Sequence, residues 1–277
     1  MEAEEMEFKE CEESQEEEEK EDKTGKEGMS EIEKSKVSIM RALVEREDPS
    51  AKQEDDLMIR RFLRARDLDI KKASTLFLKY LSWRREFVPN GSISTSEIPN
   101  QLAYNMIFVQ GVDRKGLPVV VVFGGRHKPR KGGLEEFKRF VVYVLDTLCS
   151  RGNVCGQEMF AVIIDLEGWG YSSCDIRGYL AFLSILQDCY PERLGKLFFV
   201  HVPYLFMTAW KIIYPFVDNR TRKKIEFVDN KMLESTLLGD IEESQLPNIY
   251  GGKLPLVPIQ ECLLGESTPL HVLVNTI

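Results

Sequence analysis

The chain has 277 residues, of which 43% are hydrophobic, and it carries a net charge of −8. That length and apolar content predict one main folded domain with a smaller attachment. The acidic start is unlike a secretory signal, and no apolar run approaches the ~20 residues that a membrane-spanning helix needs. We therefore expect a cytosolic protein.

The negative charge is concentrated at the start of the chain. Residues 1–22 hold 13 acidic and 2 basic residues, a net charge of −11, so the remaining residues carry +3. A segment so poor in apolar side chains cannot offset the entropy of ordering, and we predict a disordered acidic tail over 1–28. Residues 261–277 show no usable pattern and are expected to form a C-terminal tail.

Apolar residues at helical spacing predict an all-helical segment over 29–90. They indicate one helix at 30–47 and, from Asp55, a helical hairpin with a break near 67–69. The stretch "VPNGSISTSEIPN", residues 88–100, contains two prolines and a glycine. It marks the boundary with a main domain that we place at 99–260.

From residue 107 onward, the sequence alternates between strand and helix patterns. "IFVQGVDRKGLPVVVVF" indicates two strands joined by a turn at 113–116, and helices are expected at about 133–150 and 175–190. Further strands are indicated by "MFAVIIDLEGW", "KLFFVHV" and "KIEFV". This alternation predicts an α/β fold with a largely parallel sheet and helices packed on it.

The patterns that catalysis requires are not found. Asp165 ends a strand without a visible catalytic partner, so we predict that it caps a turn. His201 lies in an apolar strand and is expected to be a satisfied core histidine. The six cysteines show neither CxxC nor Cys/His spacing and are interpreted as reduced. We expect no enzyme activity, no catalytic residue and no metal.

The stretch "YLFMTAWKIIYPFVDN", residues 204–219, is apolar on more than one helical face. Such a helix is either buried on all sides or faces something apolar. It could therefore be a core helix or a wall between an apolar cavity and a membrane surface. The cations of "NRTRKK" follow it and suit a phosphate group, although a solvated surface is the alternative.

Several segments resemble the CRAL-TRIO lipid-binding family. "DLMIRRFLRARDLDIKKA" with "YLSWRREF" resembles its N-terminal helical segment, and "DRKGLPVVV", "VIIDLEGW", "YPERLGKLFFVHVP", "YPFVDNRTRKKI" and "LPNIYGGKLP" resemble successive signatures of its lipid-binding domain. The matches follow the family's order over about residues 54–255. Within the family the chain is similar to the Sec-fourteen-type phosphatidylinositol transfer proteins. The resemblance implies a sheet floor with helical walls around a lipid pocket.

The resemblance also implies a headgroup site and a gate. In the family pattern, an arginine, a glutamate, a threonine and a lysine act at the inositol-phosphate end; here they are Arg66, Glu192, Thr221 and Lys224. The lysine would offset the phosphate charge, and the glutamate would accept from inositol hydroxyls or hold the cations. Residues 204–219 become a candidate gate, for which we expect four membrane-facing side chains: Phe206, Trp210, Ile213 and Phe216. Arg193 and Lys196 lie outside the family set and are expected to be surface or structural charges.

One departure concerns the second ligand. The family's phosphatidylcholine transfer proteins carry hydroxyl residues where this chain has Phe160 and Val162, and often a tyrosine where it has Val120. Phosphatidylcholine is therefore doubtful as a second ligand, and a bulkier or more apolar one is possible.

The function implied by the resemblance is lipid transport. A monomeric, cytosolic protein would extract phosphatidylinositol from anionic membranes, to which it binds transiently, and exchange it or present it to lipid kinases. A second hydrophobic ligand is expected, but no nucleic acid and no cofactor beyond the bound phospholipid. The alternatives are a carrier of an isoprenoid-like ligand and a non-catalytic scaffold that regulates a GTPase or a membrane-trafficking complex.

Overall fold

The computed structural model describes residues 30–155, the last five by backbone alone, and 158–261. The tails expected at 1–28 and 261–277 lie outside these residues, apart from Glu261. No helix among the described residues is long and apolar enough to cross a membrane.

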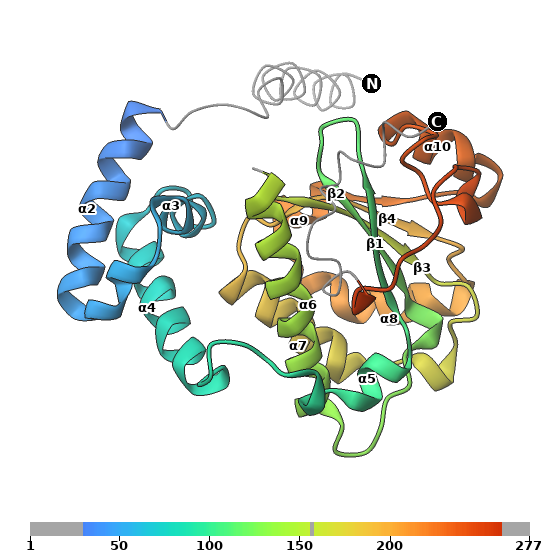
Figure 1. Cartoon of the computed structure of the whole chain (residues 1–277), viewed down its shortest axis with the longest axis horizontal. Coiled ribbons are helices and arrows are strands. Elements are labelled where there is room, and N and C mark those ends of the chain that lie inside the picture. Colours follow the sequence, from blue (N-terminus) through green and yellow to red (C-terminus); the bar gives the residue numbers. More distant parts are fainter. Residues whose placement is uncertain (1–29, 156–157, 262–277) are drawn as a thin grey trace, which may run out of the picture.

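Among the described residues, a group of three helices at the start of the chain lies beside the sheet (Figure 1). They are α2 (Glu31–Glu47), α3 (Asp56–Arg64) and α4 (Ile70–Phe87), which confirms the predicted helix and hairpin. The carboxylates of Asp55 and Asp69 accept from backbone N–H groups in the first turns of α3 and α4 and so begin these helices. Between them, Asp67 and Leu68 adopt left-handed conformations, with φ of 52° and 59°, and reverse the chain.

A five-stranded sheet forms the floor of the main domain. Its strands lie in sequence order; β1 pairs antiparallel with β2, and all further pairs are parallel. The hairpin turn is held by Asp113, whose carboxylate accepts from the N–H groups of Lys115 and Leu117 at 2.9 and 2.7 Å. The predicted, largely parallel sheet is confirmed. The strands are β1 (Ile107–Val112), β2 (Pro118–Phe123), β3 (Phe160–Asp165), β4 (Leu194–Val200) and β5 (Ile225–Phe227).

Helices cover the two faces of the sheet (Figure 1). Val120 and Val162 pack with residues of α6 (Leu134–Cys155) and α7 (Ile176–Cys189), the helices expected at about 133–150 and 175–190. Val121 and Ile163, on the opposite face, pack with Leu237 of α10 (Leu233–Asp240). The alternation of side chains along each strand therefore builds a layered α/β fold. The short helix α5 (Pro99–Ala103) precedes β1.

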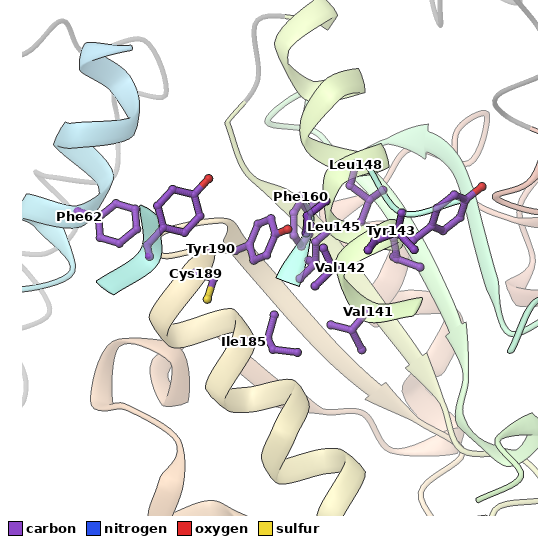
Figure 2. Close-up of a cluster of buried hydrophobic side chains, with 14 of the residues drawn as sticks. Phe62, Val141, Val142, Tyr143, Leu145, Leu148, Phe160, Ile185, Cys189 and Tyr190 are labelled. Atoms are coloured by element: carbon purple, nitrogen blue, oxygen red, sulfur yellow. The ribbon is translucent and has the colours of Figure 1, made fainter. Parts of the chain in front are cut away.

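The largest apolar cluster runs continuously from the N-terminal helices into the main domain. Figure 2 shows Phe62 of α3 on one side, Ile185 and Tyr190 in the middle, and Phe160 beyond them. Arg84 of α4 adds a polar link, because its guanidinium lies 2.8 Å from a carboxylate oxygen of Asp146 on α6. The N-terminal helices and the main domain thus share one core.

The segment 204–219 is not one helix, and that prediction was wrong. It forms α8 (Tyr204–Ile213), a 3₁₀ turn at Tyr214–Phe216 and the first residue of α9 (Asn219–Lys223). Pro215 has no backbone N–H and cannot continue the α-helical hydrogen-bond ladder. Asp218 then begins a new helix by accepting from the N–H of Thr221 at 2.9 Å.

Candidate functional site

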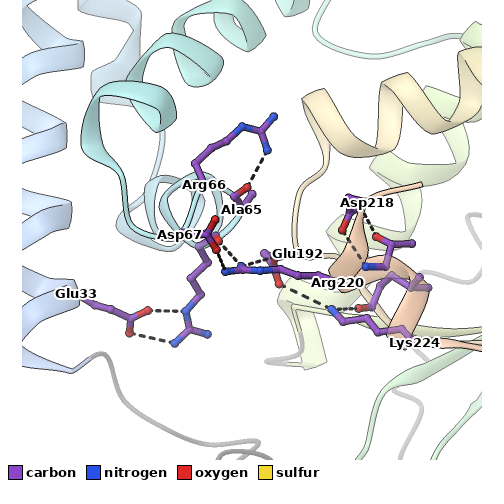
Figure 3. Close-up of polar contacts among 11 residues, drawn as sticks. Glu33, Ala65, Arg66, Asp67, Glu192, Asp218, Arg220 and Lys224 are labelled. Carbon is purple, nitrogen blue, oxygen red and sulfur yellow. Dashed lines mark hydrogen bonds and ion pairs between the residues drawn. The ribbon is translucent and has the colours of Figure 1, made fainter. Parts of the chain in front are cut away.

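Glu192 and Lys224 meet where β4 and β5 begin. Parallel pairing places Leu197 of β4 opposite Ile225 of β5, and the Leu197 N–H donates to the Lys224 carbonyl at 2.8 Å. The Lys224 Nζ lies 3.8 Å from Glu192 Oε2 and donates to the Leu194 carbonyl at 2.8 Å (Figure 3). The strand register therefore brings together two charges that are 32 positions apart in the sequence.

The backbone fixes Glu192 at an accessible turn. Its φ is 57°, a conformation that is uncommon for a residue other than glycine and persists where the surroundings hold it. The side chains of Glu192 and Lys224 remain 22% and 28% exposed. Both charged groups can therefore be reached by a ligand.

Arg66 and Thr221 do not join this pair. Arg66 donates to the Ala65 carbonyl at 2.8 Å and extends away from Glu192 (Figure 3). The Thr221 hydroxyl donates to Asp218 at 2.6 Å. Of the four expected headgroup residues, the structure brings together only the glutamate and the lysine, and a headgroup role for any of them stays a prediction.

Arg66 instead lines a shallow hollow on the surface of α4. The hollow has a volume of about 530 Å³ and exposes several cations. One of them, Lys79, lies 2.8 Å from Asp188 at the end of α7. The hollow is lined by Arg66, Asp69, Lys71, Lys72, Thr75, Leu76 and Lys79.

Arg220 is the residue at this site that the sequence did not single out. Its guanidinium lies 3.3 Å from Glu192 Oε1 and also donates to the Asp67 carboxylate and the Arg64 carbonyl oxygen. The sequence shows Arg220 only as one of several cations after residue 218. Its partners on α3 and in the following turn lie 156 and 153 positions earlier, respectively, so no local pattern could reveal them.

Arg193 and Lys196 are structural charges, as expected. Arg193 is buried and donates to the Glu158 carbonyl at 2.9 Å. Lys196 lies 2.8 Å from Asp240 and 3.0 Å from Glu226, which ties β4 to α10 and β5. Neither side chain reaches the pair of Glu192 and Lys224.

Two of the four side chains expected to face a membrane are buried. Phe206 and Ile213 are each 5% exposed, and the Phe206 ring packs 5.2 Å from the rings of both Trp169 and Phe199. The expectation for Phe206 and Ile213 is corrected, because both side chains are buried. Phe206 and Ala209 of α8 pack on residues of the sheet and of the loop after β3. Trp210 is half-buried against Phe199.

The outward apolar surface comes from the other side of α8 and from the 3₁₀ turn. Phe216 is 58% exposed, as expected for a membrane-facing residue, and Ile212 is 50% exposed. The Arg222 guanidinium lies 4.2 Å from the Tyr214 ring centroid, a cation–π contact at the border of this surface. We call the α8 patch the exposed side chains of Tyr204, Ile212, Tyr214 and Phe216.

The sheet face beneath α7 and α8 keeps accessible apolar area. Val122, Ile164 and Leu197 remain half-buried, although each lies in a strand with neighbours on both sides. Phe182 and Leu186 on α7 are also half-buried. A closely packed sheet–helix layer would bury such side chains fully.

Asp165 and His201 form a network at the carboxyl ends of β3 and β4. Asp165 Oδ1 accepts from the Glu167 N–H at 2.8 Å and lies 3.0 Å from His201 Nδ1, while Oδ2 accepts from the Tyr250 hydroxyl at 2.8 Å. Burial and the Asp165 carboxylate raise the pKa of Tyr250 far above its ordinary range, so the phenol stays a donor. The turn-capping role of Asp165 is confirmed. His201 has the expected hydrogen-bond partner, but it follows β4 and its side chain is 28% exposed, so its prediction as a core histidine within a strand was wrong.

The same network is the one group in the described part of the chain with the spacing of a metal site. Ligand atoms of Asp165, Glu167 and His201 all lie within 4.8 Å of one another. Both oxygens of Asp165 already have hydrogen-bond partners, so its buried charge is satisfied by the protein itself.

Comparison with known proteins identifies the family. The model of the CRAL/TRIO domain matches residues 102–252. The SEC14 cytosolic factor of Candida glabrata is 31% identical over 216 residues, which cover 72% of this chain and 71% of that relative. The Sec14 cytosolic factor of Schizosaccharomyces pombe is 31% identical over 233 residues, which cover 78% and 80%. The chain belongs to the CRAL/TRIO domain family and is of the Sec14 type.

Two further likenesses extend the comparison. The phosphatidylinositol/phosphatidylcholine transfer protein SFH12 of Arabidopsis thaliana is 28% identical over 235 residues, covering 79% of this chain and 43% of that relative. The crystal structure of Sfh5 matches with a TM-score of 0.62 at 20% identity, covering 90% of this chain and 98% of that one. At that identity the structural likeness supports the fold alone.

Proposed function

We propose that this chain binds phosphatidylinositol and moves it between membranes. The observation that carries the proposal is the pair of Glu192 and Lys224, which stands accessible at the start of β4 and β5. Membership of the CRAL/TRIO domain family and the likeness to a relative named as a phosphatidylinositol/phosphatidylcholine transfer protein support it.

The pair has the chemistry that an inositol phosphate needs. The Lys224 ammonium offsets the phosphate charge, and the Glu192 carboxylate accepts hydrogen bonds from inositol hydroxyls. Arg66 would join by leaving the Ala65 carbonyl, a single hydrogen bond that an anionic group can replace.

The acyl chains are assigned to the accessible apolar face of the sheet. Val122, Ile164 and Leu197 offer hydrocarbon contact there without an unpaired polar backbone group, because the strands satisfy one another. This face lies beneath α7 and α8, which would act as the helical walls.

Exchange takes place on the membrane rather than through water. Burial of each CH₂ group is worth ~0.8 kcal/mol, so a two-chain lipid does not leave the protein for water at a useful rate. The α8 patch supplies apolar contact with the bilayer, and Arg222 beside it attracts anionic lipid within a screening length of ~8 Å. The segment from α8 to α9 is the proposed gate.

Phosphatidylinositol is proposed as the preferred ligand over phosphatidylcholine. Val120 and Val162 are paired across β2 and β3, and both are buried, as is Phe160. These side chains offer no hydroxyl to a choline headgroup. We further propose that the protein is non-catalytic and presents its lipid to lipid kinases.

A vesicle assay tests this function. Wild-type protein should transfer labelled phosphatidylinositol from donor to acceptor vesicles, and Glu192→Gln and Lys224→Ala should each slow transfer at an unchanged melting temperature. Lys253→Ala is the matched control, since it removes one cation from an exposed pair with Glu243. Absence of transfer by the wild type, or equal rates in all variants, would contradict the proposal.

A further inference from the structure

Arg220 connects three segments of the chain (Figure 3). It donates to the Asp67 carboxylate and the Arg64 carbonyl oxygen, and so reaches the turn between α3 and α4. It also lies 3.3 Å from Glu192 Oε1 in the turn between α7 and β4. One side chain at the start of α9 therefore ties the end of the proposed gate both to the N-terminal helices and to the proposed headgroup carboxylate.

The turn that Arg220 contacts is a fixed anchor. Lys36 of α2 donates to the Leu68 carbonyl at 2.9 Å, and Glu33 binds Arg64 through both carboxylate oxygens, at 2.6 and 3.0 Å. Asp67 and Leu68 keep left-handed backbones, a conformation that persists where neighbouring structure enforces it. The turn thus stays in place whether or not Arg220 is bound.

The Arg220 contact itself can open. The Arg220 side chain is 47% exposed and the Asp67 side chain 86%, and ion pairs this exposed contribute little to stability. α9 has only five residues and follows a 3₁₀ turn whose Phe216 is exposed. Movement of α8 and this turn would pull Arg220 from its partners.

We propose that Arg220 is a latch that keeps the protein closed. It holds the start of α9 against the N-terminal helices and shares Glu192 with Lys224, so that the carboxylate is compensated while Arg66 is turned away. Opening at a membrane releases Arg220 and frees one oxygen of Glu192 for an inositol hydroxyl. This latch rests on the proposed phosphatidylinositol function.

Two substitutions open the latch from opposite sides. Arg220→Ala removes the cation, and Asp67→Asn removes its partner while keeping a residue type that tolerates positive φ. Arg220→Ala removes a positive charge and Asp67→Asn removes a negative one. If attraction to anionic vesicles alone set the transfer rate, the two substitutions would change that rate in opposite directions. The latch predicts the same effect: phosphatidylinositol transfer about two- to five-fold faster in both variants, and no further gain in the double variant.

Matched controls separate the latch from charge alone. Lys211→Ala removes a cation from the exposed surface of α8, and Glu243→Gln neutralises an exposed carboxylate that pairs with Lys253. Neither touches the Arg220 contacts, and neither should speed transfer.

Amide hydrogen exchange of the lipid-free protein gives a readout that needs no ligand. Residues 218–224 should exchange faster in both latch variants than in the wild type. Opposite effects of the two substitutions on transfer, or unchanged exchange over 218–224, would overturn the latch. If the wild type transferred no phosphatidylinositol but both variants still exchanged faster over 218–224, the Arg220 contact would be supported and its role in lipid transfer would be overturned.

Discussion

Replacing Phe216 with alanine should weaken vesicle binding and leave the fold intact. A phenylalanine side chain buries about 150–250 Å² when fully covered. Because Phe216 is 58% exposed, more than half of that area is free to enter a bilayer. At ~25 cal/mol per Å², its transfer contributes at most about 2–3.5 kcal/mol, or roughly 30- to 400-fold in the partition coefficient.

Co-sedimentation with phosphatidylinositol-containing vesicles measures this loss. Ile212→Ala, also within the α8 patch, should weaken binding in the same direction. Ile249→Ala is the matched control, because Ile249 is exposed to the same 50% as Ile212 but adjoins Tyr250, which packs on the opposite sheet face.

The buried face of α8 supplies the contrasting variant. Phe206→Ala empties the space between Trp169 and Phe199 and should destabilise the protein by about 3–5 kcal/mol, visible as a lower melting temperature. If Phe216→Ala and Ile249→Ala reduced vesicle binding equally, or if Phe216→Ala also lowered the melting temperature this far, the assignment of the outward face would be wrong.

Phosphatidylcholine transfer should be weak beside phosphatidylinositol transfer in the same vesicle assay, because Val162 and its neighbours give the choline headgroup no hydroxyl; comparable rates for the two lipids would refute this. Hydrogen bonds from Arg64 lower the pKa of Glu33 below its ordinary 4.5. The pair of Glu33 and Arg64 therefore stabilises the fold fully above pH 4.5, and this stabilisation is lost as the pH falls through the lowered pKa of Glu33. Thermal melts at falling pH should therefore show less acid destabilisation below pH 4.5 in Glu33→Gln than in the wild type, and parallel curves would contradict this reading.

The local parts of the fold could be predicted from the sequence because local chemistry determines them. Periodicity indicated the N-terminal helices, and the two strand patterns joined by a turn at 113–116 indicated the hairpin of β1 and β2. The segment at 204–219 shows the limit, because its apolar residues fit one long helix. Pro215 prevents that helix from continuing and Asp218 begins the next one. Hydrophobic periodicity alone takes neither effect into account.

The site could be predicted only in part because its geometry depends on tertiary contacts. Strand register brings Glu192 to Lys224, and the resemblance pointed to both. The orientation of Arg66 and the partners of Arg220 depend on how the N-terminal helices pack against α9. The sequence around these residues does not predict that packing. The outward face of α8 likewise follows from what lies beneath it rather than from its own sequence.

The most direct test of the central claim is to identify the lipid that the protein extracts. Purified protein would be incubated with vesicles of mixed phospholipids, re-isolated, and its bound lipids identified by mass spectrometry. Phosphatidylinositol should be enriched over its share in the vesicles, and Lys224→Ala should abolish the enrichment. An isoprenoid-like ligand in its place, or a protein that emerges without lipid, would contradict the account and favour a different carrier or a scaffold.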